Sequence, residues 1–436
     1  MISARRRSAG IGARAGLACA VCALPAALGA GVVPVATPAE LVAAIDGASP
    51  GDVITLAPGT YDISQNVNCD VAGTAAAPIV VRASTHLGSL IRFDALEGFK
   101  VSARHWVFED LDIQGVCAVD SDCEHAFHVF GDADFLRLRR NRVRDFNAQV
   151  KSNISSPGSG IFPDDVVIEG NEFADTAARQ TANPVTKLDV VGGRRWIVRA
   201  NFIHDFEKAQ GDHVSYAAFL KGNSRDGLFE RNLVICERDH SGGVRLGLSL
   251  GGGGSSPGSI CEDGTCSPEH QHGTLRNNVI VNCPQDVGIY LNAAADSRIY
   301  DNTLVANTGI DVRFTASTAD LRNNLVSGAI RNRDGGSSTQ SANLTGVTTV
   351  QYQQWFADPL AADLTLLDGT AFVDLAEPLA AVPDDYCGAI RGTAPDRGAV
   401  EYAGTTCDTT QAGGGADVFR DGFATGGTGQ WSAAVP

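Results

Sequence analysis

Methionine and positive charge are both scarce in this chain. It has one Met in 436 residues, and its 34 Lys and Arg stand against 50 Asp and Glu, for a formal net charge of −16. Proteins bind phosphate backbones with basic faces, so this balance argues against nucleic acid as a partner. An anionic partner is left only a locally basic cleft, which must stand out against the surface around it.

Long apolar runs are missing after the first 30 residues, so no membrane span is expected. The first 30 residues are typical of a secretory signal, because four arginines precede the apolar run LACAVCALPAALGA, which is rich in small residues. Cleavage is expected near Gly29 or Ala30, and the loss of four Arg makes the net charge −20. The mature protein is therefore expected to be secreted or periplasmic.

Closely spaced cysteine pairs with matching histidines are also absent, which argues against a zinc site. Nine Cys follow the signal, and cysteines of an exported protein favour disulfides. The expected pairs are Cys117–Cys123, Cys261–Cys266, Cys387–Cys407 and, from equivalent places in adjacent repeats, Cys236–Cys283. Cys69 would then be unpaired.

A repeated turn is the most regular feature that the chain does have. An asparagine lies three residues after one apolar residue and two before another, in strings such as VRANFI and FERNLV. The seven asparagines are Asn141, Asn171, Asn201, Asn232, Asn278, Asn302 and Asn324, with gaps of 30, 30, 31, 46, 24 and 22 residues. Such spacing predicts an all-β solenoid, in which stacked asparagines hydrogen-bond along the axis and play a structural role.

The repeat also predicts the domain boundaries. We expect a signal over residues 1–30, the solenoid over 31–345, a C-terminal cap on its far end over 346–404, and a Gly/Thr-rich linker and tail over 405–436. A helix near residues 38–48 should cover the first coil, whose edge would otherwise be open. The 46-residue gap holds a long insertion, and such loops often line a binding site.

The opening PGDVITLAPGTY and the N-x-[VIL] coils, over roughly residues 35–340, resemble the right-handed parallel β-helix of the pectate-lyase-like class. The chain is most similar there to polysaccharide lyase family six, which includes chondroitinase B and alginate lyases. Lys221, Asn232 and Arg245, in FLKG, FERN and GGVRLG, follow that family's order of lysine base, asparagine turn and arginine. The resemblance implies an all-β, right-handed parallel β-helix with an N-terminal capping helix.

Only this resemblance raises the question of a calcium site. The family holds calcium with acidic residues five and seven positions before the lysine, and here those positions are Tyr216 and Val214. No cofactor is therefore predicted, although calcium stays open without that acidic pair. His270 and His272, with Glu269, could form a metal group, but i,i+2 spacing in a loop is a weak indication, and no metal ligand is assigned.

Period-two alternation in the third strand of each coil predicts one exterior stripe. Its expected members are Lys187, Asp189, Lys221, Arg245, Ser249, Tyr290, Asn292, Asp311 and Arg313. The stripe is net basic on an acidic protein, as recognition of a uronate requires, and an ordinary row of solvated strand charges stays the alternative.

This stripe predicts an exported polysaccharide lyase, expected to be a monomer, that cleaves an acidic, uronate-containing glycan by β-elimination. Lys221 would be the base, with its pKa lowered by neighbouring Arg245, which would hold the carboxylate, while Tyr290 would be the acid. The expected substrate contacts are Lys187, Asp189, His213, Ser249, His270, Asn292 and Arg313.

Two other functions stay open: a non-catalytic, glycan-binding or adhesive solenoid, and a glycoside hydrolase or epimerase on the same scaffold. A hydrolase needs two exterior carboxylates at a suitable separation, and the stripe offers only Asp189 and Asp311, several coils apart.

Overall fold

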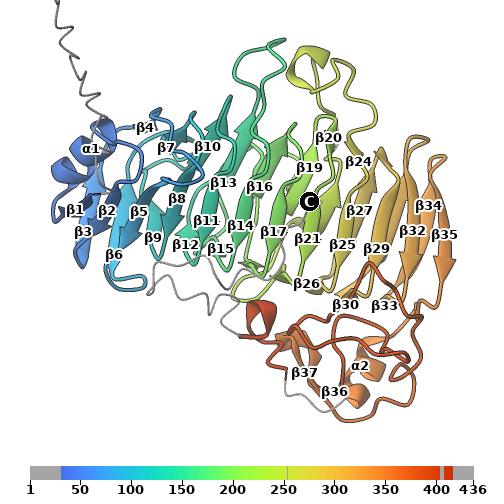
Figure 1. Ribbon diagram of the computed structural model, residues 1–436. Helices are drawn as coiled ribbons and strands as arrows, with labels where there is room; N and C mark the ends of the chain where they lie inside the picture. Colours follow the sequence, from blue (N-terminus) through green and yellow to red (C-terminus); the bar gives the residue numbers. More distant parts are fainter. Residues whose placement is uncertain (1–30, 253, 403–406, 416–436) are drawn as a thin grey trace, which may run out of the picture.

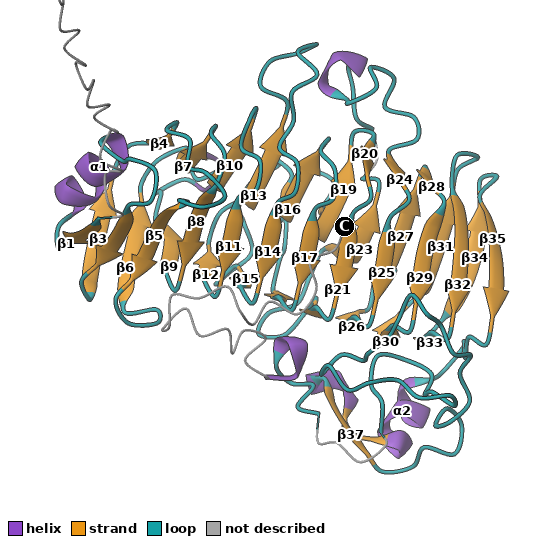
Figure 2. Cartoon of the chain, in the orientation of Figure 1, coloured by secondary structure: helices purple, strands orange, loops and turns teal. Residues whose placement is uncertain are grey.

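The computed structural model describes residues 31–252, 254–402 and 407–415, so the expected signal and most of the tail lie outside it. Within these residues three parallel sheets, A, B and C, wind about one axis, and successive coils add one strand to each (Figure 1). Figure 2 shows that strands and loops make up nearly all of the chain. This is the solenoid that the repeated turn predicts.

Each sheet runs the length of the solenoid. Sheet A contains β1 (Val32–Val35), β2 (Val53–Leu56), β5 (Ile79–Ala83), β8 (Trp106–Glu109), β11 (Arg137–Arg139), β14 (Val167–Glu169), β17 (Ile197–Arg199), β21 (Leu228–Glu230), β25 (Thr274–Arg276), β29 (Ser297–Tyr300), β32 (Thr318–Arg322) and β35 (Ser337–Ser341). Sheet B contains β3 (Gly59–Ile63), β6 (Ser89–Phe93), β9 (Asp112–Gly115), β12 (Arg142–Arg144), β15 (Glu172–Ala174), β18 (Phe202–His204), β22 (Leu233–Ile235), β26 (Val279–Cys283), β30 (Thr303–Asn307) and β33 (Leu325–Val326).

Sheet C carries the expected stripe. Its strands are β4 (Val67–Cys69), β7 (Glu97–Val101), β10 (His125–Phe130), β13 (Ala148–Asn153), β16 (Val185–Val191), β19 (Val214–Lys221), β23 (Val244–Leu250), β27 (Ile289–Asn292), β31 (Gly309–Arg313) and β34 (Ala329–Arg333). A small fourth sheet, at a corner of the coils, pairs β20 (Ser224–Arg225), β24 (His270–Gln271) and β28 (Ala294–Ala295). Alternate side chains of sheet C point inward, where Leu188, Leu248 and Ile289 are fully buried.

The asparagines form a continuous ladder between sheets A and B. Each side-chain amide donates to the side-chain oxygen of the asparagine in the following coil, at 2.8–3.1 Å, and to a backbone carbonyl of the preceding coil. All seven predicted asparagines are buried, which confirms the structural role. An eighth rung, Asn343, escaped the sequence pattern because Gln340 replaces the apolar residue three positions before it.

The first coil is covered by α1 (Pro38–Asp46), as the periodicity predicts. Thr37 and Glu40 form a capping box at its start, and Leu41 and Ile45 are buried against the first strands. The short strand β1, which was not predicted, joins sheet A beside β2. The helix therefore shields an end of the core that would otherwise be exposed.

The C-terminal segment lies on the side of the solenoid, against sheet B, and it also bonds to the last coil at Asn323 and Ser341. It contains α2 (Thr349–Trp355), β36 (Phe356–Asp358) and β37 (Asp363–Leu366), and lies against sheet B in Figure 1. Its buried aromatic residues pack on outward-facing side chains of sheet B, among them Leu233, Val279 and Val305. Residues 407–415, part of the expected linker, are held to this segment, since the Thr409 hydroxyl donates to the Ala362 carbonyl at 2.6 Å.

All four expected disulfides are present: Cys117–Cys123, Cys236–Cys283, Cys261–Cys266 and Cys387–Cys407. Cys69 is the free cysteine among the described residues, and it is buried. Among those residues no helix combines the length and the apolar character that crossing a membrane requires.

Candidate functional site

Most of the expected stripe lies in two adjacent rows on the outer face of sheet C. Strand register aligns Asp189, Ser249, Tyr290 and Asp311 in one row, with Phe219 between the first two. The second row contains Lys221, Asn292 and Arg313. Two members of the predicted stripe, Lys187 and Arg245, do not reach this face.

Lys187 is fully buried. Its ammonium pairs with the Asp175 carboxylate at 2.6 Å and donates to the Phe146 carbonyl at 3.0 Å. Burial lowers the pKa of Lys187 and raises that of Asp175. The loops that lead from sheet B into β13 and β16 supply both partners, so the lysine is enclosed where its strand begins. The structure thus corrects the expectation that Lys187 faces solvent.

Arg245 is also enclosed at the start of its strand. Its side chain is 1% exposed, and its guanidinium donates to the Gly242 and His240 carbonyls and pairs with Glu207 at 2.9 Å. Register places Arg245 opposite Ser215, six residues before Lys221 along the neighbouring strand, which corresponds to about 20 Å. The expected contact between Lys221 and Arg245 is therefore not present.

A different set of groups surrounds Lys221. Its ammonium lies 4.5 Å from the centre of the Phe219 ring, and the backbone of Gly252 packs over both side chains. A Cβ atom on Gly252 would lie 2.9 Å from Lys221 Cδ, so only glycine fits without displacing the lysine. The Glu269 carboxylate anchors the insertion beside the lysine by accepting from the Gly222 N–H at 2.9 Å. The insertion therefore does line this site.

Electrostatics and burial act on Lys221 in opposite directions. Burial lowers its pKa, nearby Asp189 raises it, and Lys151 lowers it again, so that the net pKa is below the ordinary value. Lys151 pairs with Asp189 at 2.9 Å. Burial raises the pKa of Asp189, but the two lysines outweigh burial and keep it below its usual range. One Asp189 oxygen, Oδ1, is buried without a partner. We call Lys151, Asp189 and Lys221 the lysine cluster.

Polar residues continue the face toward the N-terminal coils. His128 pairs with Glu97 at 2.7 Å, and Lys100 pairs with the same carboxylate at 2.7 Å. His125 lies near Lys151, and burial lowers its pKa to about 4. Sequence reasoning missed Lys151 and these residues, although the alternation in HAFHVF and AQVKSN could have indicated them.

Toward the C-terminal coils the face is hollowed by a pocket of about 200 Å³. The residues that line it are Val214, Tyr216, Leu246, Asp286, Tyr290, Asp311, Arg313 and Arg333. The Arg313 guanidinium donates to the Tyr290 hydroxyl at 3.2 Å. Val214 and Tyr216 pack with Leu246 as an apolar wall.

The two expected histidine contacts have different surroundings. His213 is exposed in the loop before β19. His270 is fully buried, and its Nδ1 lies 2.7 Å from the Ser224 hydroxyl. Burial lowers the pKa of His270 to about 3. His270 is thus part of the corner between coils, and the structure corrects the expectation that it contacts the substrate. Ser249 and Asn292 lie in the expected rows but are both buried.

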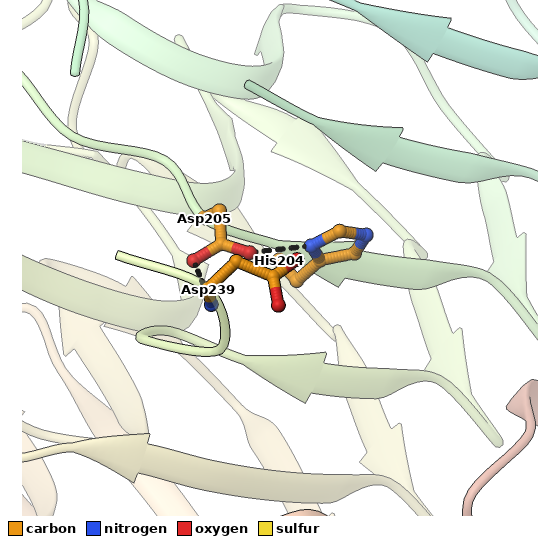
Figure 3. A group of neighbouring side chains, drawn as sticks. All are labelled: His204, Asp205 and Asp239. Carbon is orange, nitrogen blue, oxygen red and sulfur yellow. Dashed lines mark hydrogen bonds and ion pairs between the residues drawn. The ribbon is translucent and has the colours of Figure 1, made fainter. Parts of the chain in front are cut away.

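His204, Asp205 and Asp239 form the one group in the described residues with the spacing of a metal site (Figure 3). The Asp205 carboxylate is already fully used, since Oδ2 lies 2.7 Å from His204 Nδ1 and Oδ1 accepts from three backbone N–H groups of residues 238–240. Burial raises the pKa of Asp205, but these hydrogen bonds lower it to about 2. The group therefore anchors the loop after β22, and we assign it no ligand.

Comparison with known proteins identifies the fold. The protein-family model described as a right-handed β-helix region matches residues 125–326 of this chain. The pectate lyase Pel9A is 14% identical, with a TM-score of 0.51 over 86% of this chain and 97% of its own. An alginate lyase from Paenibacillus sp. str. FPU-7 is 14% identical, with a TM-score of 0.45 over 72% of this chain and 98% of its own.

A PL6 family polysaccharide lyase from Pseudopedobacter saltans is also similar, at 14% identity and a TM-score of 0.36 over 77% of this chain and 96% of its own. No curated protein sequence matches the chain. Similarity at this level of identity establishes fold alone. The sheet topology and the matched region agree on this fold: the chain forms a right-handed parallel β-helix.

Proposed function

We propose that the protein is a polysaccharide lyase that cleaves an acidic, uronate-containing glycan by β-elimination. The observation that carries the proposal is the lysine cluster: a partly exposed lysine of lowered pKa stands beside a second lysine on the outer face of sheet C. A lysine base must be neutral to accept a proton, and its ordinary pKa is about 10.4. Lowering that pKa is therefore the property that this chemistry requires.

Lys221 takes the proton from the carbon next to the uronate carboxylate. The electron pair left behind forms a carbon–carbon double bond and breaks the bond to the glycosidic oxygen, which then takes up a proton. Lys151 neutralises the carboxylate in place of the buried Arg245, because it is 19% exposed and lies beside Lys221. Water can supply the last proton, since Lys221 is in contact with solvent.

Asp189 positions these two lysines. It pairs with Lys151 and faces Lys221, so its charge acts on both ammonium groups. Tyr290 lies two coils beyond β19, in the pocket, so in this mechanism it contacts another part of the glycan.

The experiment is incubation of the protein with alginate, chondroitin and pectate while the absorbance of unsaturated sugar is followed. Wild type should raise the absorbance with at least one polymer, and Lys221→Ala should abolish the rise with an unchanged thermal melt. Lys221→Arg keeps the positive charge, but its pKa of at least about 12 leaves no neutral form, so it should bind glycan and remain inactive. An active Lys221→Arg variant would rule out the base.

The alternatives give other outcomes. A hydrolase would release reducing ends without unsaturated sugar. Asp311 is a poor participant, because Arg331 and Arg333 each hold one of its oxygens at 2.5 Å. If the protein binds glycan but produces neither unsaturated sugar nor new reducing ends, it is a non-catalytic, glycan-binding or adhesive solenoid. We also propose export to the periplasm or medium, which the four disulfides support. Fractionation of the native host tests this.

A further inference from the structure

We propose that the pocket between β19, β23, β27 and β31 is a separate subsite that binds one acidic sugar residue of the glycan, through Arg313 and Arg333. It lies on the same outer face as the lysine cluster but does not touch it. The identity of the ligand as a uronate rests on the proposed function. The presence of the pocket and of its two arginines does not depend on that function.

The size and wall of the pocket fit one sugar ring. Its volume of about 200 Å³ is below the range of about 300–1,000 Å³ that is usual for drug-sized ligands. Val214, Tyr216 and Leu246 form an apolar side, and Tyr290 adds a second aromatic face. Sugars present both apolar ring faces and hydroxyl edges, so such a mixed lining is suited to them.

The arginines keep donors that the protein does not use. Arg313 donates from Nε to Asp334 and from Nη1 to Tyr290, and its Nη2 makes no hydrogen bond within the described residues. Arg333 donates from Nη1 to Asp311 at 2.5 Å, which leaves Nε and Nη2 free of such bonds in the same part of the chain. A guanidinium offers five N–H donors in a planar fork that matches a carboxylate. Both arginines are partly exposed, at 34% and 42%.

Phe314 adds an aromatic ring beside Arg313. It follows Arg313, is 37% exposed, and has the positive φ that Ala293 and Asp334 also have after the neighbouring strands of sheet C. Its ring lies 4.7 Å from the Arg313 guanidinium carbon. An exposed aromatic ring thus packs against one of the two arginines that line the pocket.

Asp286 gives the subsite a chemical signature. Its Oδ1 accepts from its own turn, at Val287, and Oδ2 makes no hydrogen bond within the described chain. Burial and the charge of Asp311 raise its pKa. A bound carboxylate would raise it further, so binding of an acidic sugar should take up a proton at Asp286. The charged and titratable groups around Asp286 are Tyr216, Tyr290, Asp311, Arg313, Arg331 and Arg333.

The subsite is remote from the proposed chemistry. Arg313 shares a row with Lys221 three strands away, and at about 4.8 Å per strand this places the two positions about 14 Å apart. A glycan that lies along sheet C would reach both only if it extended over several sugar rings. The subsite therefore favours chains over short oligomers.

The test is calorimetric binding of an octameric oligouronate to the Lys221→Ala protein, which excludes turnover. Adding Arg313→Ala should weaken binding roughly tenfold, the loss expected for one charge-assisted contact. Adding Asp286→Asn should strengthen binding at pH 7 and remove the tightening otherwise seen between pH 7 and pH 5. Arg322→Ala is the matched control, because Arg322 is 39% exposed and paired with an aspartate, but lies on sheet A.

A carboxyl-reduced octamer should bind without any dependence on Arg313. The inference is overturned if Arg313→Ala binds the oligouronate as the parent does, if Asp286→Asn weakens binding, or if no oligouronate binds. Thermal melts of each variant show that it is folded. Failure of wild type to produce unsaturated sugar would overturn the proposed lyase and leave the binding result intact.

Discussion

Replacing Lys187 with methionine should destabilise the fold strongly, because Lys187 holds a buried charge and not a substrate. The substitution leaves the Asp175 carboxylate buried without its cation. Asp175 would then take up a proton, and for an ordinary pKa of about 3.9 this costs at pH 7 about 1.36 × 3.1, or about 4 kcal/mol. That figure lies within the range of about 3–5 kcal/mol known for breaking buried pairs.

The pH dependence has a definite sign. In the variant, the folded-state pKa of Asp175 lies above its unfolded-state value, so the folded state binds more protons and loses stability as pH rises through this interval. The penalty should therefore fall to about 1.5 kcal/mol at pH 5. Urea unfolding followed by circular dichroism at both pH values measures it.

Two variants control this experiment. Lys187→Met combined with Asp175→Asn removes the charge and should recover most of the stability at pH 7. Lys208→Met removes a lysine whose partner, Asp212, is 67% exposed, so it should cost no more than about 1 kcal/mol. The reasoning fails if Lys187→Met loses less than about 1 kcal/mol at pH 7 or if its loss is the same at pH 5.

Three further substitutions test the site and the scaffold. Asp189→Asn removes the carboxylate that raises the pKa of Lys221, so the rise of kcat/KM with pH should move to lower pH. Gly252→Val should displace the loop that buries Lys221 and move that rise to higher pH; a shift in the same direction for both variants would contradict the proposed base. Asn232→Ala leaves two buried backbone groups without partners and should cost about 2–6 kcal/mol in urea unfolding, whereas a loss below about 1 kcal/mol would argue against the ladder.

The fold was largely predictable because its main determinant is local. An asparagine turn needs only one polar residue between two apolar ones, and this pattern is visible wherever the coil is regular. The sequence pattern misses both ends of the ladder. At the first end the backbone N–H of Leu111 donates to the Asn141 side chain, and at the other end Asn343 lies beside the exposed edge strand. The lateral position of the C-terminal segment was not predictable, because it depends on outward apolar residues of sheet B that alternation alone assigns to solvent.

The candidate site was predictable only in part, because alternation gives the direction of a side chain but not what covers it. Loops bury Lys187 and Arg245, although both stand at outward positions of their strands. Which residues face Lys221 depends on how neighbouring coils stack and on the loops that fold over the strands, and alternation within one strand gives neither. Alternation could have indicated Lys151 as an outward residue but not its place beside Lys221, and Asp286, in a turn, became visible only in three dimensions.

The asparagine ladder separates the length of a loop from the alignment of the coils that it joins. Asn232 and Asn278 are 46 residues apart and bond at 2.9 Å, and Asn302 and Asn324, 22 apart, bond at 3.0 Å. A coil can thus gain or lose loop residues while its neighbours stay in phase. The insertion beside Lys221 is one such addition, and it buries the lysine without altering the frame beneath it. Loop grafting at this corner should therefore change the chemistry of the face while the solenoid folds as before.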